Sequence, residues 1–431
     1  MSTAPTSARS GARTLLVVLA CAAFLLTLAG SALKNTVQVY FLPIADSFGG
    51  SRAGLAWAVT LFALMSALAS PFVGSIADRI GGARTLAVGT FLSGLALVGT
   101  ALSHQLWLFV AVYCLIGAVA VTMLSFVPLG VFVDELFRDG RRGLTYSLIT
   151  NGAAVGFIVL VPLWTWLGQW LDWRTVLETL GAVFLVVLTP LSLVVARQSD
   201  RLARPAADSA EAAPRPAALP LAEQLRLCLQ AKQLRNLAVA FVGCGFTMAF
   251  IDVHFVPFMT DHHMSAAISS SAVAILGACE VGGSLIAGWL CDRGLVKGVL
   301  VGAYLLRCLA MLVLSVNPMP STVLLFGVVF GLSYLASVIA TSMWIAQVLP
   351  APVRGTAMGL VWMVHALGVA CGSQIGAWLE GMTHSYLQII LICAALTAGS
   401  ATIALLSRSP LPRLAPITVP RDADLTDSPL S

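Results

Sequence analysis

The feature that most constrains this chain is a series of twelve apolar runs, each close to the length that crosses a bilayer as a helix. The hydrocarbon core of a membrane is about 30 Å thick, which takes roughly 20 helical residues. Irregular backbone facing lipid would leave its polar groups unpaired, so each run is predicted to be a helix. The runs cover residues 14–42, 52–76, 84–102, 106–133, 142–167, 174–196, 236–260, 267–290, 298–316, 321–348, 355–379 and 385–407.

The composition agrees with a chain whose surface faces lipid. Charged residues make up 10% of the sequence, whereas a soluble domain carries about 25%. So few charges could not coat a water-facing surface, which argues against a soluble enzyme and against a nucleic-acid binder. The Cys residues are scattered, and no CxxC pair or Cys/His cluster indicates a metal site. We therefore expect an all-α integral membrane protein without enzymatic activity, cofactor, metal or nucleic-acid partner.

One connection between the runs differs from the others. Residues 197–222 are rich in Ala, Pro, Arg and acidic residues, which is typical of a flexible linker. The segment that follows, residues 223–235, is predicted to form a short amphipathic helix at the membrane surface. The predicted domains are a six-helix bundle, this linker with its short helix, a second six-helix bundle and a tail, over residues 1–196, 197–235, 236–407 and 408–431.

The distribution of positive residues predicts the orientation in the membrane. With the N-terminus in the cytoplasm, 20 of the 24 Lys and Arg residues lie in the tails and the even-numbered connections, and the outer loops hold only Arg52 and Arg174. We expect a multi-pass protein of the plasma membrane, the inner membrane of a bacterium, with both termini cytoplasmic. We also expect a monomer.

The two halves of the sequence match each other at a nearly constant offset. A Gly-x-x-x-Asp-Arg motif follows the second run and recurs 214 residues later, at Gly74, Asp78, Arg79 and at Gly288, Asp292, Arg293. An Arg-Gly pair at 142–143 recurs 212 residues later at 354–355. Several matches at nearly one offset indicate two parallel six-helix repeats, and such repeats place a binding site at their interface near the membrane midplane.

The first copy of the motif extends from Gly74 to Arg84 and resembles the signature between helices 2 and 3 of the major facilitator superfamily. The resemblance covers nearly the whole chain. It implies two pseudo-symmetric six-helix bundles and a secondary transporter that works by alternating access. It also implies a cytoplasmic gate built from the motif residues Gly74, Asp78, Arg79, Gly81, Arg84, Gly288, Asp292 and Arg293.

A narrower resemblance concerns the monocarboxylate-porter-like branch of that superfamily. The segment from Lys34 to Phe48 is similar to the end of helix 1 in that branch, and the segments starting at Arg141 and Arg354 are similar to the entries of its helices 5 and 11. In that branch helix 8 often carries an acid and, four residues on, an arginine that holds the substrate carboxylate. Here Glu280 matches the acid, but Ser284 stands in place of the arginine.

Ionisable groups inside spanning helices are costly and mark transport pathways or buried pairs. Lys34 lies about 13 Å inside the outer end of the first run, where we expect it to bind an anionic substrate. The alternatives are a side chain that reaches back to the interface and a structural pair with a carboxylate. Four further residues are predicted to line the substrate site, with packing as the alternative: Tyr40, Asn151, His254 and His365.

Three residues of the second half are predicted to couple transport to a proton: Asp252, Glu280 and Arg307. A salt bridge to Lys34 is the alternative for Asp252. Glu280 and Arg307 fall at similar depths on antiparallel neighbouring runs, which predicts a direct ion pair. That pair would be either structural or a relay in which Arg307 tunes Glu280.

The sequence therefore favours a proton-coupled secondary transporter of a small organic anion, most simply a carboxylate. Two alternatives stay open. The protein could export a neutral or cationic small molecule, with Asp252 or Glu280 as the partner of the cation. It could also be a transporter-like sensor that binds a ligand without moving it.

Overall fold

The computed structural model describes residues 6–50, 52–137, 141–203, 219–316 and 318–408. Over these residues the chain is helical and has no strand. The elements of the first half are α1 (Thr6–Gly30), α2 (Ala32–Val39), α3 (Phe41–Ser47), α4 (Arg52–Ile80), α5 (Gly82–Ala101), α6 (Leu106–Ala111), η1 (Val112–Gly117), α7 (Ala118–Met123), α8 (Phe126–Leu136), α9 (Arg142–Leu167), α10 (Trp173–Val183), η2 (Phe184–Leu188) and α11 (Thr189–Ala203). Those of the second half are α12 (Leu221–Gln230), α13 (Lys232–Ala249), η3 (Phe250–His254), α14 (Phe255–Asp261), α15 (Ala266–Asp292), α16 (Val296–Val316), α17 (Pro320–Tyr334), α18 (Ala336–Val348), η4 (Ala351–Val353), α19 (Arg354–Thr383) and α20 (Leu387–Leu406).

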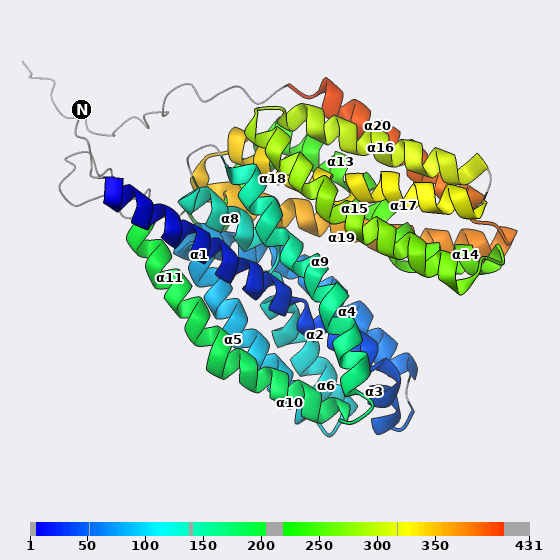
Figure 1. The fold of residues 1–431 in the computed structure, drawn as a ribbon, viewed down its shortest axis with the longest axis horizontal. Coiled ribbons are helices and arrows are strands. Elements are labelled where there is room, and N and C mark those ends of the chain that lie inside the picture. The colour runs from blue at the N-terminus through cyan, green and yellow to red at the C-terminus, as the bar shows by residue number, and fades with distance from the viewer. Residues whose placement is uncertain (1–5, 51, 138–140, 204–218, 317, 409–431) are drawn as a thin grey trace, which may run out of the picture.

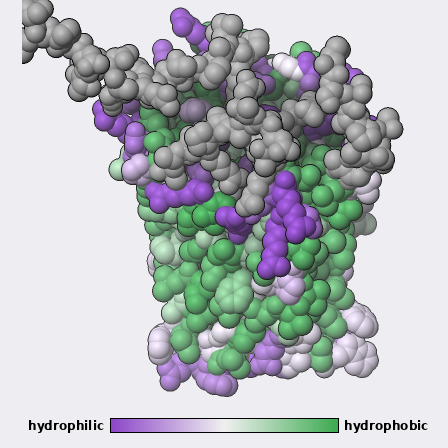
Figure 2. All heavy atoms as spheres, turned by 90° about the vertical axis from the view of Figure 1, so that its left-hand side faces the viewer, coloured by the Kyte–Doolittle hydropathy of each residue, from purple (hydrophilic) through white to green (hydrophobic). Residues whose placement is uncertain are grey.

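Within the described residues these elements combine into 12 helices that are long and apolar enough to cross a membrane, from Arg13–Val39 to Leu387–Leu406. This confirms the predicted fold class. Large apolar side chains on the outer faces of the helices are exposed, among them Trp57, Val186 and Leu305. Figure 2 shows a broad apolar band across one face of the molecule, with hydrophilic residues gathered toward its upper and lower edges. Lipid is the solvent that suits such a band.

The helices form two bundles, α1 to α11 and α13 to α20, as the sequence repeat predicts (Figure 1). The bundles contact each other where α4 and α15 end and where α9 and α19 begin, and they diverge toward the opposite end. We call these two ends of the molecule the closed end and the open end. The contacts of the closed end pair α4 with α19 and α15 with α9, which are equivalent pairs under the repeat.

Glycines allow the backbones to approach each other at the closed end. A Cβ atom added to Gly74 would overlap with the backbone of Gly355, and one added to Gly288 would overlap with the backbone of Gly143. Small residues permit this kind of close helix contact in membranes. The first glycine of each motif copy therefore lies at the contact between the bundles.

Several spanning helices are broken, and the breaks follow the repeat. α7 ends at Met123 and α8 begins at Phe126, while α17 ends at Tyr334 and α18 begins at Ala336. The seventh span contains η3, a π-helical turn at the position that matches the junction of α2 and α3 in the first span. Interrupted helices of transporters gather around their binding sites. Hydropathy predicted continuous helices here and missed the breaks.

The predicted linker lies partly outside the described residues, which omit 204–218, and the predicted tail lies outside them from residue 409 onward. α11 continues to Ala203, beyond the predicted boundary at 196. The amphipathic helix predicted over 223–235 is shorter, because α12 ends at Gln230 and α13 begins at Lys232. Gln224 and Cys228 on one face of α12 are fully buried, so this face packs on protein rather than on the membrane surface.

Candidate functional site

Asp78, near the end of α4, joins the two bundles at the closed end. Its Oδ1 accepts a hydrogen bond from the Gly355 amide at 2.6 Å. Its Oδ2 accepts from the Thr356 amide at 2.8 Å and from the Thr356 hydroxyl at 2.9 Å. Because Gly355 and Thr356 begin α19, the carboxylate sits at the N-terminus of a helix, where the dipole favours an anion.

Asp292, at the end of α15, makes the equivalent contact on the other side. Its carboxylate accepts from the amides of Gly143 at 2.7 Å and Leu144 at 3.0 Å, at the start of α9. Both motif acids thus bind a helix N-terminus of the opposite bundle. These are the residues that the repeated motif predicted as a gate.

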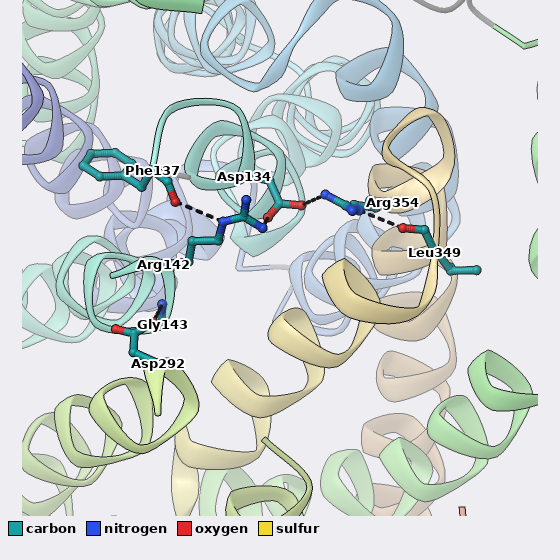
Figure 3. Close-up of polar contacts among 7 residues, drawn as sticks. All are labelled: Asp134, Phe137, Arg142, Gly143, Asp292, Leu349 and Arg354. Atoms are coloured by element: carbon teal, nitrogen blue, oxygen red, sulfur yellow. Dashed lines mark hydrogen bonds and ion pairs between the residues drawn. The ribbon is translucent and has the colours of Figure 1, made fainter. Parts of the chain in front are cut away.

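A third acid of the closed end, Asp134 on α8, was not predicted. It forms ion pairs with Arg142 at 3.3 Å and with Arg354 at 2.5 Å, one arginine from each bundle (Figure 3). The arginines are themselves equivalent, because each Nε donates to a carbonyl five residues earlier, that of Phe137 at 3.0 Å and that of Leu349 at 2.9 Å. The repeated arginines were visible in the sequence and indicated that a counter-charge was needed, but nothing in the sequence singled out Asp134 as that charge.

Gly81 and Arg84 of the first motif act within the N-terminal bundle. Gly81 has a φ of +94°, a conformation that favours glycine. The turn that it makes lets the Gly82 amide donate to the Glu135 carboxylate at 3.2 Å. Arg84 pairs with Asp200 on α11 at 2.6 Å.

The remaining arginines of the two motif copies also make local contacts. The guanidinium carbon of Arg293 lies 3.4 Å from the centroid of the Trp289 ring, one helical turn earlier. Arg79 donates to the Leu219 carbonyl at 3.4 Å, in the segment that leads into α12. The bridges between bundles are therefore carried by the acids of the motif and not by its arginines.

Asn151 and Ser284 mark the inner limit of the contact between the bundles. The Ser284 hydroxyl donates to Asn151 Oδ1 at 3.0 Å, and the Ser147 hydroxyl donates to the Ser284 carbonyl at 2.8 Å. Both side chains are buried. Asn151, predicted to line the substrate site, is thus engaged across the bundles. Ser284, which stands in place of the arginine expected from the family resemblance, takes part in this same contact between the bundles.

Lys34 on α2 and Asp252 in η3 lie beyond this contact, toward the open end. Both side chains are exposed. Lys34 and His365 lie within electrostatic range of the Asp252 carboxyl, but Lys34 and Asp252 form no ion pair within 4.0 Å. Opposite charges from the two bundles are therefore exposed and lie within electrostatic range of each other. π-helical turns such as η3 recur at functional sites.

Tyr40 and His254, at equivalent positions of the repeat, are buried within their own bundles. The Tyr40 hydroxyl donates to the Trp164 carbonyl at 2.7 Å. The Nε2 atom of His254 lies 3.2 Å from the Ser373 carbonyl oxygen. These contacts favour the packing alternative for both residues, because their polar atoms already have partners.

His365 lies deeper in the C-terminal bundle and is also buried. Its ring centroid lies 4.8 Å from that of Trp362 and 4.9 Å from that of Phe241. The Trp362 ring stacks in turn on Phe126 of the N-terminal bundle at 4.8 Å. His365 therefore lies behind an aromatic contact between the bundles, within electrostatic range of Asp252.

Arg307 is fully buried, and the predicted ion pair with Glu280 is wrong, since the two groups do not approach within 4.0 Å. One terminal nitrogen of Arg307 donates to Cys244 Sγ and Thr247 Oγ1, and the other to the carbonyls of Ser333 and Tyr334 and the hydroxyl of Ser337. A cation suits this place, because Ser333 and Tyr334 end α17. Glu280 is half-buried and lies within electrostatic range of Asp252 and Arg307.

Comparison with known proteins places this geometry in a family. A sequence model described as the Major Facilitator Superfamily matches residues 15–279 and 236–426. The chain is 27% identical over 398 residues to the "Uncharacterized MFS-type transporter YcxA" of Bacillus subtilis, covering 89% of this chain and 92% of the relative. It is 24% identical over 416 residues to "Monocarboxylate transporter 12" of Mus musculus, covering 88% and 82% of the two chains.

Two solved structures share the fold. A proton:xylose symporter, XylE, superposes with a TM-score of 0.70 at 12% identity, covering 91% of this chain and 96% of the other. FucP in the outward conformation superposes with a TM-score of 0.69 at 13% identity, covering 90% and 97%. The matched family model spans most of the sequence and agrees with the repeated motif, the twelve helices of the described residues and the paired contacts of Asp78 and Asp292 at the closed end. This chain belongs to the Major Facilitator Superfamily.

Proposed function

We propose that this protein is a proton-coupled symporter of a small organic anion, most simply a monocarboxylate. The observation that carries the proposal is the exposed pair of Lys34 and Asp252, which lie on opposite bundles within electrostatic range of each other without forming an ion pair. An ammonium group at this place offers a carboxylate a charge-assisted hydrogen bond, which is worth about 1.5–3 kcal/mol. The printed name of the mouse relative, a monocarboxylate transporter, supports the same substrate class.

Proton coupling follows from the charges around this site. Asp252 competes with a bound carboxylate for Lys34, and a proton on Asp252 removes that competition. Substrate and proton then favour each other's binding, which is the reciprocity that a symporter requires. Glu280, whose carboxyl lies within electrostatic range of Asp252, is the first candidate for the group that carries the proton through the cycle, and Asp252 is the next.

Orientation follows from the position of the positive residues. Arg79, Arg84, Arg142, Arg293 and Arg354 lie at the closed end. By the positive-inside rule this end is cytoplasmic, so the described state is open to the outside. We propose a monomer in the plasma membrane with both termini in the cytoplasm. Its cycle alternates between this state and one in which Asp78 and Asp292 release their helix N-termini.

Replacing Lys34 with Ala should weaken binding of a monocarboxylate by at least about tenfold, since one decade corresponds to about 1.4 kcal/mol. Lys34→Arg should restore only part of the affinity, because a planar guanidinium does not reproduce a compact ammonium. Isothermal titration of the purified protein with a panel of short monocarboxylates measures the effect. Lys232→Ala, which removes an exposed lysine at the start of α13, is the matched control.

Two results together would remove Lys34 from the site. One is unchanged affinity in Lys34→Ala. The other is free reaction of Lys34 with a membrane-impermeant amine reagent without protection by substrate. The exposed carboxylate of Asp252 would then favour the second candidate function, transport of a cationic compound, and an amine panel in the same titration tests it.

A further inference from the structure

Two side chains of the linker helix α12, those of Gln224 and Cys228, are fully buried against the closed end, and Gln224 is the one that contacts both bundles. The Oε1 atom of Gln224 accepts a hydrogen bond from the Ser75 hydroxyl of α4 at 2.5 Å. It also lies 3.1 Å from the hydroxyl oxygen of Thr356 on α19, whose single proton is donated to Asp78. The Nε2 atom of Gln224 donates to the Pro352 carbonyl at 2.9 Å. The side chain of Gln224 thus forms hydrogen bonds with both bundles. It lies next to Thr356, whose backbone amide and hydroxyl donate to Asp78.

Among the residues that the structure describes, this contact of Gln224 has no counterpart on the other side of the repeat. The residue equivalent to Thr356 in the first half is Leu144, which has no hydroxyl, and the residue equivalent to Ser75 in the second half is Trp289. Asp78 accordingly receives three hydrogen bonds where Asp292 receives two. The two motif contacts are therefore unequal, and α12 reinforces the side that contains Asp78.

The contacts of α12 with the C-terminal bundle outnumber those with the N-terminal bundle. Besides Pro352 and Thr356, the Cys228 thiol lies 3.8 Å from the Val353 carbonyl oxygen. All three partners belong to η4 and the start of α19. Toward the N-terminal bundle α12 itself offers the Ser75 bond, and the segment before it offers the longer bond from Arg79 to Leu219.

We propose that Gln224 is a positioning residue of the transport cycle, which ties α4 to α19 while the closed end is shut. α12 moves with the C-terminal bundle, and opening of this end breaks the bond between Gln224 and Ser75. The linker helix thereby sets the balance between the two access states. The inference rests on the proposed alternating access but on no particular substrate.

The experiment measures the closed end directly, without substrate. Spin labels at Arg197→Cys on α11 and Arg408→Cys after α20, both exposed positions, report the separation of the bundles by pulsed EPR. Cys21, Cys279, Cys308 and Cys371, the thiols that are not buried, are replaced by Ala in this background. Gln224→Ala is expected to raise the ratio of open to shut molecules by about tenfold, the equivalent of one to two buried hydrogen bonds.

Two variants make the result specific. Ser75→Ala removes only the bond to the N-terminal bundle and should shift the distances in the same direction, which guards against a general folding defect of Gln224→Ala. Gln230→Ala removes an exposed glutamine at the end of the same helix and should leave the distances unchanged. Unchanged distances in both Gln224→Ala and Ser75→Ala would overturn the proposal, as would an equal shift in Gln230→Ala.

The thiol of Cys228 tests which bundle α12 follows. Burial raises the pKa of this thiol to about 12, so it should react slowly with an alkylating reagent while it packs on Val353. Mass spectrometry of the Cys228 peptide in Ser75→Ala should show the same slow reaction, because α12 stays with the C-terminal bundle. Rapid alkylation in the opened molecules would contradict this part of the proposal. These measurements need no substrate, so their result does not depend on whether a carboxylate binds. Failure of the proposed substrate class can therefore be distinguished from failure of the proposed role of Gln224.

Discussion

Replacing Asp78 with Asn is expected to reduce transport by at least about a hundredfold while substrate binding survives. The carboxylate accepts two amides and a hydroxyl from the start of α19. Charge-assisted hydrogen bonds contribute about 1.5–3 kcal/mol each, and a neutral side-chain amide turns a donor toward one of these N–H groups. Loss of two such bonds costs at least about 3 kcal/mol. It therefore lowers the equilibrium ratio of molecules with the closed end shut to those with it open by about a hundredfold.

Counterflow in proteoliposomes and equilibrium binding measure the two quantities separately. Asp200→Asn is the matched control, because Asp200 pairs with Arg84 at the same end but within one bundle. An exposed pair of this kind contributes less than about 1 kcal/mol, so transport should fall by no more than about fivefold. Binding lost in proportion to transport in Asp78→Asn would count against the gate role.

Replacing Glu280 with Gln is expected to abolish accumulation driven by a pH gradient and to leave exchange intact. During exchange the transporter returns with substrate bound, so no net release of a proton is needed. Accumulation requires that the transporter release both substrate and proton before it returns. Glu280 has no ion pair within 4.0 Å, so its carboxyl is free to take up and release a proton as the bundles move. Uptake against a gradient and isotope exchange, measured on the same vesicles, distinguish the two modes.

Glu178→Gln provides the control for this experiment, since Glu178 is an exposed acid on α10. It should accumulate substrate as the unmodified protein does. Accumulation that persists in Glu280→Gln would exclude Glu280 as the sole carrier and leave Asp252 as the next candidate. The two carboxyls lie within electrostatic range of each other, so the double variant would then decide between them.

Much of this architecture could be predicted because it depends on two patterns that are visible in the sequence itself, the hydropathy of the spans and the repeated motif. Hydropathy alone predicts the twelve spans, since each must satisfy its own backbone in lipid. The motif repeated at an offset of 214 predicts Asp78 and Asp292 as equivalent residues. Their partners, the amides that begin α19 and α9, carry no side-chain signature and become visible only in the fold.

The remaining features depend on packing between distant segments. Asp134 is one acid among many until Arg142 and Arg354 converge on it from two bundles. Equal depth in the membrane suggested an ion pair between Glu280 and Arg307. Depth does not define the direction of a side chain, and Arg307 turns instead to the carbonyls that end α17. The break between α17 and α18 leaves these carbonyls without a partner in the helix. Hydropathy gives no strong signal of such a break.

The most direct test of the central claim is uptake of a labelled short monocarboxylate into proteoliposomes under an inward-directed proton gradient. The account predicts accumulation above the external concentration, its collapse when a protonophore dissipates the gradient, and its loss in Lys34→Ala. Binding of the carboxylate without any counterflow would contradict the account and indicate a sensor. Accumulation of a cationic amine, with no movement of the carboxylate, would contradict it as well.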